Sequence, residues 1–283
     1  MSKIKVSELF YSIQGEGRYM GVPSVFLRTF GCNFTCSGFG MPKGELSDER
    51  DKIAIELNKF NNYRDLPLVH TGCDSYASWD PRFKHLSPVL SVDAIVDAIL
   101  DLLPHKAWRE EHLVITGGEP LLGWQRAYPE LLSHDRMLLL NELTFETNGT
   151  QEIDNDFHNF IIYEWQKNRI PDNLTFSVSP KLSVSGERWE DAIKPEIINQ
   201  YEGLGYTYLK FVVASNEDVE EAEQAVNEYR KGGFAGPVYL MPCGGTEDLY
   251  STNNRAVAEF AMKKGWRYSD RLQIPLFKNA WGT

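Results

Sequence analysis

Short apolar runs and amphipathic stretches alternate along most of the chain, a pattern typical of strands alternating with helices. Runs rich in β-branched and aromatic residues predict strands at 5–11, 24–28, 112–116, within 138–149, from 174, at 208–213 and at 237–242. Stretches of helical period predict helices at 92–103, 216–233 and 253–265, the first with Ser91 as its N-cap. The pattern therefore predicts an α/β fold with a mostly parallel sheet, in which ligands bind at the carboxyl ends of the strands.

One segment interrupts this alternation. Residues 37–72 begin with the Gly- and Pro-rich sequence SGFGMPKG and continue into a polar stretch. We expect a helix there from about Ser47 to Phe60, with Ser47 as its N-cap. No internal repeat or low-complexity tract divides the rest, so we expect a single domain over residues 1–283 with an insertion at 37–72.

Composition and charge narrow the class of function. The 283 residues carry a formal net charge of −11, which argues against a broad nucleic-acid-binding surface. No apolar run approaches the roughly 20 residues that span a bilayer, and the N-terminus lacks the apolar core of a signal peptide. We therefore expect a cytoplasmic protein, in which four cysteines indicate metal binding or catalysis more than a disulfide framework.

The cysteines are the first candidate chemistry. Cys32 and Cys36 form a C-x3-C motif directly after a predicted strand, and Cys73 follows after a long gap. Thiolates suit iron–sulfur clusters, and three of them leave one iron free for another ligand. The spacing alone also fits structural cysteines or half of a zinc site. Cys243, after a later strand, is interpreted as a bystander or a pocket-lining residue.

Five motifs together resemble one family. The segment LFYSIQGEGRYMGVPSVFLRTFGCNFTC resembles the N-terminus of the 7-carboxy-7-deazaguanine synthase (QueE) family, which belongs to the radical S-adenosylmethionine enzymes. TGGEP (116–120), ETNGT (146–150), SVSPK (177–181) and YLMPCGG (239–245) follow in that family's order. The resemblance spans essentially the whole chain. It implies a modified, incomplete (β/α) barrel of the radical S-adenosylmethionine type, with an insertion in the cluster-binding region.

The resemblance also implies a reaction. Family members are lyases that convert 6-carboxy-5,6,7,8-tetrahydropterin to 7-carboxy-7-deazaguanine with release of ammonia, a step in the biosynthesis of queuosine and other 7-deazapurines. The implied cofactors are a [4Fe–4S] cluster, S-adenosylmethionine and Mg²⁺. The implied partners are the pterin substrate, an electron donor such as flavodoxin and a second copy of the chain in a homodimer, with neither nucleic acid nor membrane.

The family's functional residues map onto this sequence motif by motif. Cys32, Cys36 and Cys73 would hold the cluster, and Ser75, where the family usually has Thr, would bind Mg²⁺. The residues implied to bind S-adenosylmethionine are Asp74, Gly117, Gly118, Glu119, Asn148, Ser179 and Lys181. The residues implied to bind the substrate are Gln14, Glu16, Gly17 and Arg28, of which Glu16 and Arg28 would be catalytic. Taken singly, most of these motifs are also ordinary turn sequences, and Arg28 could be a surface arginine.

Two departures from the family pattern keep other functions open. The gap before Cys73 is long, and Pro275 and Phe277 stand where the family often has a Gln-x-His element. The alternatives are a radical S-adenosylmethionine enzyme that activates another protein by forming a glycyl radical, and a non-catalytic cluster- or zinc-binding protein on the same scaffold.

Overall fold

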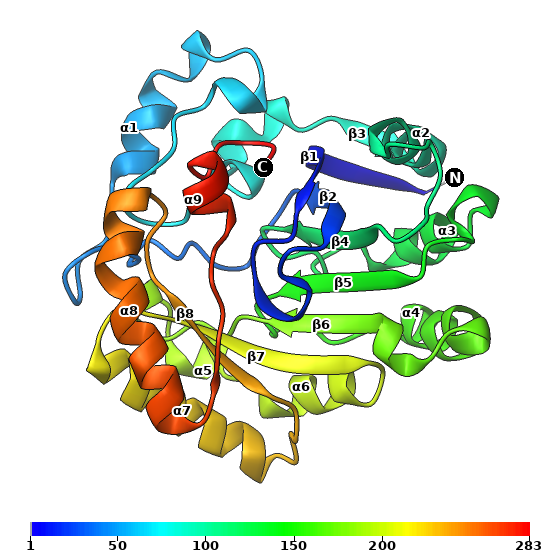
Figure 1. The fold of residues 1–283 in the computed structure, drawn as a ribbon. Coiled ribbons are helices and arrows are strands. Elements are labelled where there is room, and N and C mark those ends of the chain that lie inside the picture. The colour runs from blue at the N-terminus through cyan, green and yellow to red at the C-terminus, as the bar shows by residue number, and fades with distance from the viewer. Residues whose placement is uncertain (1) are drawn as a thin grey trace.

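A mixed sheet forms the centre of the protein in the computed structural model, which describes residues 2–283 (Figure 1). Within these residues the strands run in the order β3-β1-β2-β4-β5-β6-β7-β8-β9. Strands β2 to β9 of this order are parallel, and β1 pairs antiparallel with both β2 and β3. The strands are β1 (Lys3–Ile13), β2 (Pro23–Thr29), β3 (Val89–Ser91), β4 (His112–Gly117), β5 (Glu142–Thr147), β6 (Leu174–Val178), β7 (Tyr206–Val213), β8 (Val238–Pro242) and β9 (Arg267–Tyr268).

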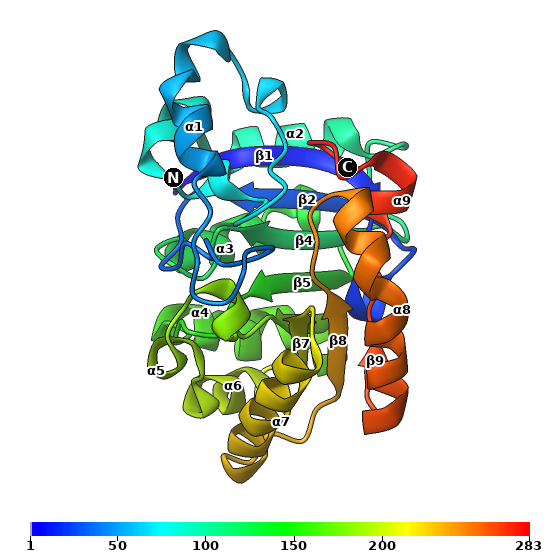
Figure 2. The ribbon, with the colours of Figure 1, turned by 90° about the vertical axis from the view of Figure 1, so that its left-hand side faces the viewer.

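Most of the helices connect the parallel strands and pack against one face of the sheet, whereas α1 and α9 lie apart from that face (Figures 1 and 2). The helices are α1 (Glu49–Ile55), α2 (Val92–Leu102), α3 (Tyr128–Leu132), α4 (Asn155–Phe160), α5 (Trp189–Ala192), α6 (Pro195–Glu202), α7 (Asn216–Lys231), α8 (Glu247–Lys264) and α9 (Gln273–Phe277). No helix within residues 2–283 is both long and apolar enough to cross a membrane.

The two faces of the sheet differ sharply in polarity because side chains alternate along a strand. On β7, Leu209 and Phe211 point into the main hydrophobic core beneath the helices. Lys210, between them, points to the opposite face and lines a pocket. Glu146 on β5 and Arg28 on β2 lie on that same polar face. A charged face on buried parallel strands is costly to desolvate, so it indicates a binding surface.

The predicted pattern of elements is confirmed over most of the chain. The observed strands include each predicted run, and the sheet is mostly parallel as expected. Helix α2 begins after Ser91, whose hydroxyl oxygen accepts a hydrogen bond of 3.3 Å from the Ala94 amide, so the predicted N-cap is confirmed.

The helix predicted within the insertion is shorter than expected. It covers only Glu49–Ile55, and Asp48 rather than Ser47 occupies the N-cap position. Ser47 still accepts a 3.3 Å hydrogen bond from the Glu49 amide, but its hydroxyl donates to the carbonyl of Thr71 and so closes the base of the loop. Beyond Ile55 the chain turns in short 3₁₀ segments, because its apolar residues serve a separate small core rather than one helical face.

This small core joins the insertion to the C-terminal segment. Its buried members include Tyr63, Leu66 and Tyr76. Trp281 packs edge-on against Tyr63 at a centroid distance of 4.7 Å, and its indole N–H donates to the Leu66 carbonyl at 2.7 Å. Residues more than two hundred positions apart in sequence therefore form one wall beside the polar face of the sheet.

A buried histidine at the start of β4 gives stability a predictable dependence on pH. His112 lies between Ser24 (3.2 Å) and Thr144 (2.8 Å), and burial lowers the pKa of its imidazole to about 3. In the unfolded chain the ring takes up a proton near pH 6.5. The contribution of His112 to the free energy of unfolding should therefore be constant above pH 6.5 and fall by up to about 1.4 kcal/mol per pH unit from there towards pH 3. Urea unfolding between pH 7.5 and 4.5 measures this slope, which His112→Gln should reduce; an equal slope in the variant would contradict the assignment.

Candidate functional site

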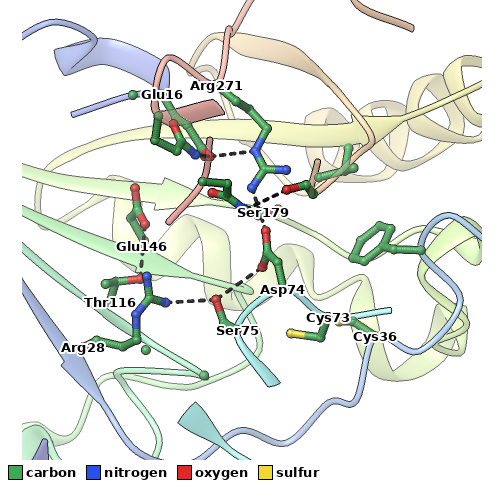
Figure 3. Close-up of a pocket in the computed structure, with 18 of the residues that line it drawn as sticks. Glu16, Arg28, Cys36, Cys73, Asp74, Ser75, Thr116, Glu146, Ser179 and Arg271 are labelled. Carbon is green, nitrogen blue, oxygen red and sulfur yellow. Dashed lines mark hydrogen bonds and ion pairs between the residues drawn. The ribbon is translucent and has the colours of Figure 1, made fainter. Parts of the chain in front are cut away.

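A cavity of about 260 Å³ opens at the carboxyl ends of the parallel strands, over the polar face of the sheet. The loops after β2, β4, β5, β6 and β8 line it, together with the base of the insertion and the C-terminal segment. Figure 3 shows acidic and basic side chains meeting on one side of this cavity and cysteine sulfurs on the other. Its position is the one expected for a ligand site on a parallel sheet.

Three of the four cysteines lie where the sequence predicts. Cys32 and Cys36 follow β2, Cys73 closes the insertion, and all three line the cavity. They also form one small cluster with Phe34 and Phe39. No group of three or more Cys, His, Asp or Glu side chains within residues 2–283 is arranged to hold a single metal ion. A four-iron cluster places each thiolate on a different iron, and three cysteines that line one cavity are a suitable ligand set for such a cluster.

The cysteines are protonated in the metal-free protein. Burial raises the pKa of the Cys32 thiol to about 12 and also raises the pKa values of Cys36 and Cys73. Iron held by these three sulfurs would displace the protons, because the ligand is the thiolate. Cys243, on the loop after β8, also lines the cavity. This agrees with its interpretation as a pocket-lining residue.

The GGEP turn packs tightly on the cysteine loop. A side chain added at Gly117, whose φ is +153°, would lie 2.3 Å from the Thr29 carbonyl oxygen, and one at Gly118 would lie 2.7 Å from Cβ of Cys32. The two glycines line the cavity, and close packing of β4 on the loop after β2 already requires them. The GGEP turn and the cysteine loop are therefore held in fixed positions relative to each other.

Glu119 is fully buried and does not reach the cavity wall. Its carboxylate accepts hydrogen bonds from the Thr147 hydroxyl (2.8 Å) and from the amides of Asn148 (2.7 Å) and Leu121 (3.0 Å). Burial raises the pKa of this carboxyl to about 7. These contacts hold the loops after β4 and β5 together, and direct contact of Glu119 with a cofactor stays a prediction.

Asn148, Ser179 and Lys181 all line the cavity. The Asn148 side chain donates to Asn33 at 2.9 Å, which ties the loop after β5 to the cysteine loop. The Lys181 ammonium lies 3.3 Å from the Ser179 hydroxyl. Their polar groups converge on one region of the cavity, as a binding site for a charged cofactor requires.

Glu16 lies at the centre of a buried charge network. Lys210 and Arg271 form ion pairs with its carboxylate, Arg271 at 3.2 Å, and the Gln273 amide donates to it at 2.9 Å. Burial opposes ionisation, but the two cations outweigh it and lower the pKa of Glu16 to about 2. Gln14 donates to Glu146 at 3.1 Å beside it. Glu16 is therefore held as a carboxylate that faces the cavity.

A chain of polar contacts crosses the cavity from Arg28 to Glu16 (Figure 3). Arg28 donates to the Ser75 hydroxyl at 3.0 Å, Ser75 lies 3.3 Å from Asp74, and Asp74 pairs with Arg271 at 2.6 Å. Partial desolvation of the Asp74 carboxyl raises its pKa, but the positive charge of Arg271 outweighs this effect and lowers the pKa of Asp74. The sequence-predicted metal and substrate residues thus belong to one continuous network.

The structure adds residues that the sequence analysis missed. Arg271 and Lys210 are buried, Glu146 is half-buried, and all three line the cavity. Lys210 and Glu146 carried a usable signal, because each is a charged residue within an otherwise buried strand. Arg271 carried none, because it lies in an irregular loop after β9.

Gly17 and the C-terminal positions Pro275 and Phe277 lie away from the cavity wall. Gly17 does not line the cavity; its amide donates to Ser269 at 2.9 Å at a φ of +67°, so it shapes the turn that carries Glu16. Pro275 and Phe277 also lie away from the cavity wall on α9. Gln273, at the start of the same helix, lines the cavity and contacts Glu16, so the C-terminal segment does contribute to the site.

Several buried polar atoms of the cavity have no hydrogen-bond partner within residues 2–283. They are Glu8 Oε1, Arg28 Nε, Ser177 Oγ and Gln273 Oε1. A buried polar atom left unpaired costs about 1–3 kcal/mol. Their presence together around one cavity is the mark of a site completed by a polar ligand.

Comparison with known proteins agrees with this geometry. No family model matches the chain. A 7-carboxy-7-deazaguanine synthase from Halobacterium salinarum is 31% identical over 98% of this chain and 91% of its own length, and one from Pyrobaculum aerophilum is 29% identical over 99% and 97%. The crystal structure of QueE from Escherichia coli is similar in fold, with a TM-score of 0.55, 20% identity and coverage of 94% of this chain and 93% of that one. The chain therefore belongs to the 7-carboxy-7-deazaguanine synthase family.

Proposed function

We propose that this protein is a 7-carboxy-7-deazaguanine synthase, a radical S-adenosylmethionine lyase that converts 6-carboxy-5,6,7,8-tetrahydropterin to 7-carboxy-7-deazaguanine and releases ammonia. The relatives named for this activity support the proposal. The observation that carries it is one cavity in which the cysteine triad faces a buried carboxylate, Glu16, and a buried guanidinium, Arg28. These two groups complement the N–H edge of a pterin and its carboxylate.

The cysteine side of the cavity would hold the two cofactors. Cys32, Cys36 and Cys73 would bind the [4Fe–4S] cluster, and Asp74, Gly117, Gly118, Asn148, Ser179 and Lys181 would surround S-adenosylmethionine. Glu119 would position this set by fixing the backbone of Asn148. When bound, cluster and S-adenosylmethionine supply the radical that starts the reaction. We interpret the sheet as an incomplete (β/α) barrel in a single domain, with residues 37–72 inserted between two cluster ligands.

Recognition of the substrate would fall to the network on the other side. Glu16 would accept hydrogen bonds from the pterin edge, with Gln14 beside it and Gly17 shaping the turn. A carboxylate has lone pairs beyond those that Lys210 and Arg271 occupy, so it can accept donors from a ligand as well. Arg28 would bind the substrate carboxylate through its guanidinium, which also forms an ion pair with the buried Glu8 at 3.4 Å.

Magnesium would bind between these two sides. Ser75 keeps the oxygen that a threonine would offer, and it lies against both Arg28 and Asp74. Mg²⁺ prefers oxygen ligands and is often completed by substrate and water. A metal ion there would be shared by Ser75 and the carboxylate that Arg28 binds. We further propose a cytoplasmic homodimer that receives electrons from a flavodoxin-type donor.

The experiment is anaerobic reconstitution with iron and sulfide, followed by turnover with S-adenosylmethionine, Mg²⁺, a reductant and 6-carboxytetrahydropterin. Mass spectrometry should detect 7-carboxy-7-deazaguanine and 5′-deoxyadenosine together. Deoxyadenosine without the deazaguanine would indicate a radical enzyme with another substrate, such as a protein. Neither product from a protein with an intact cluster would favour the non-catalytic scaffold.

Replacing Arg28 separates its proposed role from general damage. Arg28→Met should raise the KM for the carboxylated pterin by roughly 10- to 100-fold, because a charge-assisted bidentate contact contributes about 1.5–3 kcal/mol. The KM for S-adenosylmethionine should stay within about twofold. Steady-state kinetics with each substrate varied in turn measures both, and an unchanged pterin KM would remove the carboxylate-binding role.

A further inference from the structure

We propose that Glu187 is a positioning residue that holds the C-x3-C loop in the conformation in which Cys36 faces the cavity. The inference concerns a residue outside every motif considered above. Its link to the iron–sulfur cluster rests on the proposed function; the loop contact itself does not.

Cys36 adopts an unusual backbone conformation. Its φ is +48°, in the left-handed region that glycine adopts readily and other residues seldom do. An unfavourable conformation of this kind persists only where surrounding contacts impose it. The loop around Cys36 therefore needs an external support.

Glu187 supplies that support from a loop more than one hundred and fifty residues away in sequence. One oxygen of its carboxylate accepts three hydrogen bonds, from the Thr35 amide (2.8 Å), the Thr35 hydroxyl (3.1 Å) and the Cys36 amide (2.7 Å). Hydrogen bonds to an ionised acceptor are stronger than neutral ones. The carboxylate thus fixes the backbone on the N-terminal side of the left-handed residue.

A second contact fixes the loop just after Cys36. The Gly38 amide donates to the Ser185 carbonyl at 2.9 Å, and a side chain at Gly38 would lie 2.6 Å from the Gly186 nitrogen. The Ser185 hydroxyl in turn accepts from the Glu187 amide at 3.2 Å. Residues 185–187 therefore form hydrogen bonds with the cysteine loop on both sides of Cys36.

The supporting loop also leads back to the proposed cofactor site. It follows β6 and begins with Ser179 and Lys181, which line the same cavity. Ala192 of α5, just beyond Glu187, packs against Cys36 and Phe34. One continuous segment thereby positions both a cluster ligand and two residues proposed for S-adenosylmethionine.

The negative charge of the Glu187 carboxylate should also lower the reduction potential of a cluster bound nearby. The carboxylate lies directly against the backbone of a cluster ligand, where its negative charge disfavours addition of an electron to a nearby cluster. Geometry and charge can be separated by substitution. Glu187→Ala removes both, and Glu187→Gln keeps an acceptor oxygen for the same amides but removes the charge.

The first test uses the metal-free protein and amide hydrogen exchange. In Glu187→Ala the amides of Thr35 and Cys36 should exchange roughly tenfold faster or more, since charge-assisted hydrogen bonds that protect them are lost. Glu190→Ala is the matched control, because Glu190 is exposed on α5 and, within residues 2–283, its only ion pair is with Arg188 at 3.3 Å. Exchange in Glu187→Ala equal to that in Glu190→Ala would overturn the proposal.

The second test uses the reconstituted protein. Glu187→Ala should lose iron to a chelator roughly tenfold faster than Glu190→Ala, and Glu187→Gln should retain iron within about twofold but show a more positive reduction potential by EPR-monitored titration. Equal iron loss in both alanine variants would overturn the link to the cluster. If wild-type protein bound no cluster while exchange still responded, the proposed function would fail and the loop contact would stand.

Discussion

Cys73→Ser is expected to abolish the iron–sulfur cluster and with it all turnover. Cys73 lies beyond the insertion but lines the same cavity as Cys32 and Cys36, and its sulfur accepts a hydrogen bond of 3.3 Å from the Trp79 indole. Such a bond stabilises a thiolate, as a ligand position requires. Serine keeps the size of the side chain but is a poor ligand for iron, so the fold should survive while the cluster does not.

Cys243→Ser is the matched control for this substitution. Cys243 also lines the cavity and is 5% exposed, so it is the alternative third ligand on position alone. Iron and sulfide analysis with the visible absorption spectrum should show a normal cluster in Cys243→Ser and none in Cys73→Ser. The reverse result would make Cys243 the third ligand and the long gap before Cys73 a misleading feature.

Much of the fold could be predicted because its strands are short, apolar and separated by polar helices. Strand β4 is an unbroken run of buried apolar residues, and in helix α2 the helical period agrees with the capping residue Ser91. The helix within the insertion was overestimated because a polar stretch behind a candidate N-cap predicts a helix without showing where its apolar residues pack. They instead pack into a small core completed by Trp281, and no local pattern reports a partner so distant in sequence.

The residues of the site also differ in how well the sequence predicts them. Cys32, Glu16 and Arg28 stand in dense motifs at strand ends, and the structure brings them to one cavity. Arg271 and Glu187 act through contacts made by irregular loops, where sequence carries neither period nor motif. The charges that set the electrostatics of the cavity were therefore the hardest part to predict, although a lysine within the buried strand β7 was a visible sign.

Arg271→Met should cause a large loss of stability although it leaves the cysteines intact. Arg271 is buried and pairs with both Glu16 and Asp74, at 3.2 and 2.6 Å. Methionine keeps the bulk and removes the charge, leaving two carboxylates short of a partner. Breaking a buried pair in this way costs about 3–5 kcal/mol, and the 37% exposure of the Asp74 side chain places the expected loss near 3 kcal/mol. Arg267→Met, a change of the same kind at an exposed arginine, should cost well under 1 kcal/mol.

The dependence of this loss on pH distinguishes charge from packing. In the wild type the pKa of Glu16 is lowered to about 2, so its contribution is complete above about pH 4.3 and disappears as the pH falls towards 2. In Arg271→Met the carboxylates are harder to ionise, and protonation at acid pH relieves their repulsion. The difference in free energy of unfolding between wild type and variant should therefore be large at pH 7 and shrink by more than half at pH 3. Urea unfolding at both pH values measures it; a difference that is equal at pH 7 and pH 3 would mean that Arg271 stabilises the site by packing alone, and that Lys210 by itself holds Glu16 ionised.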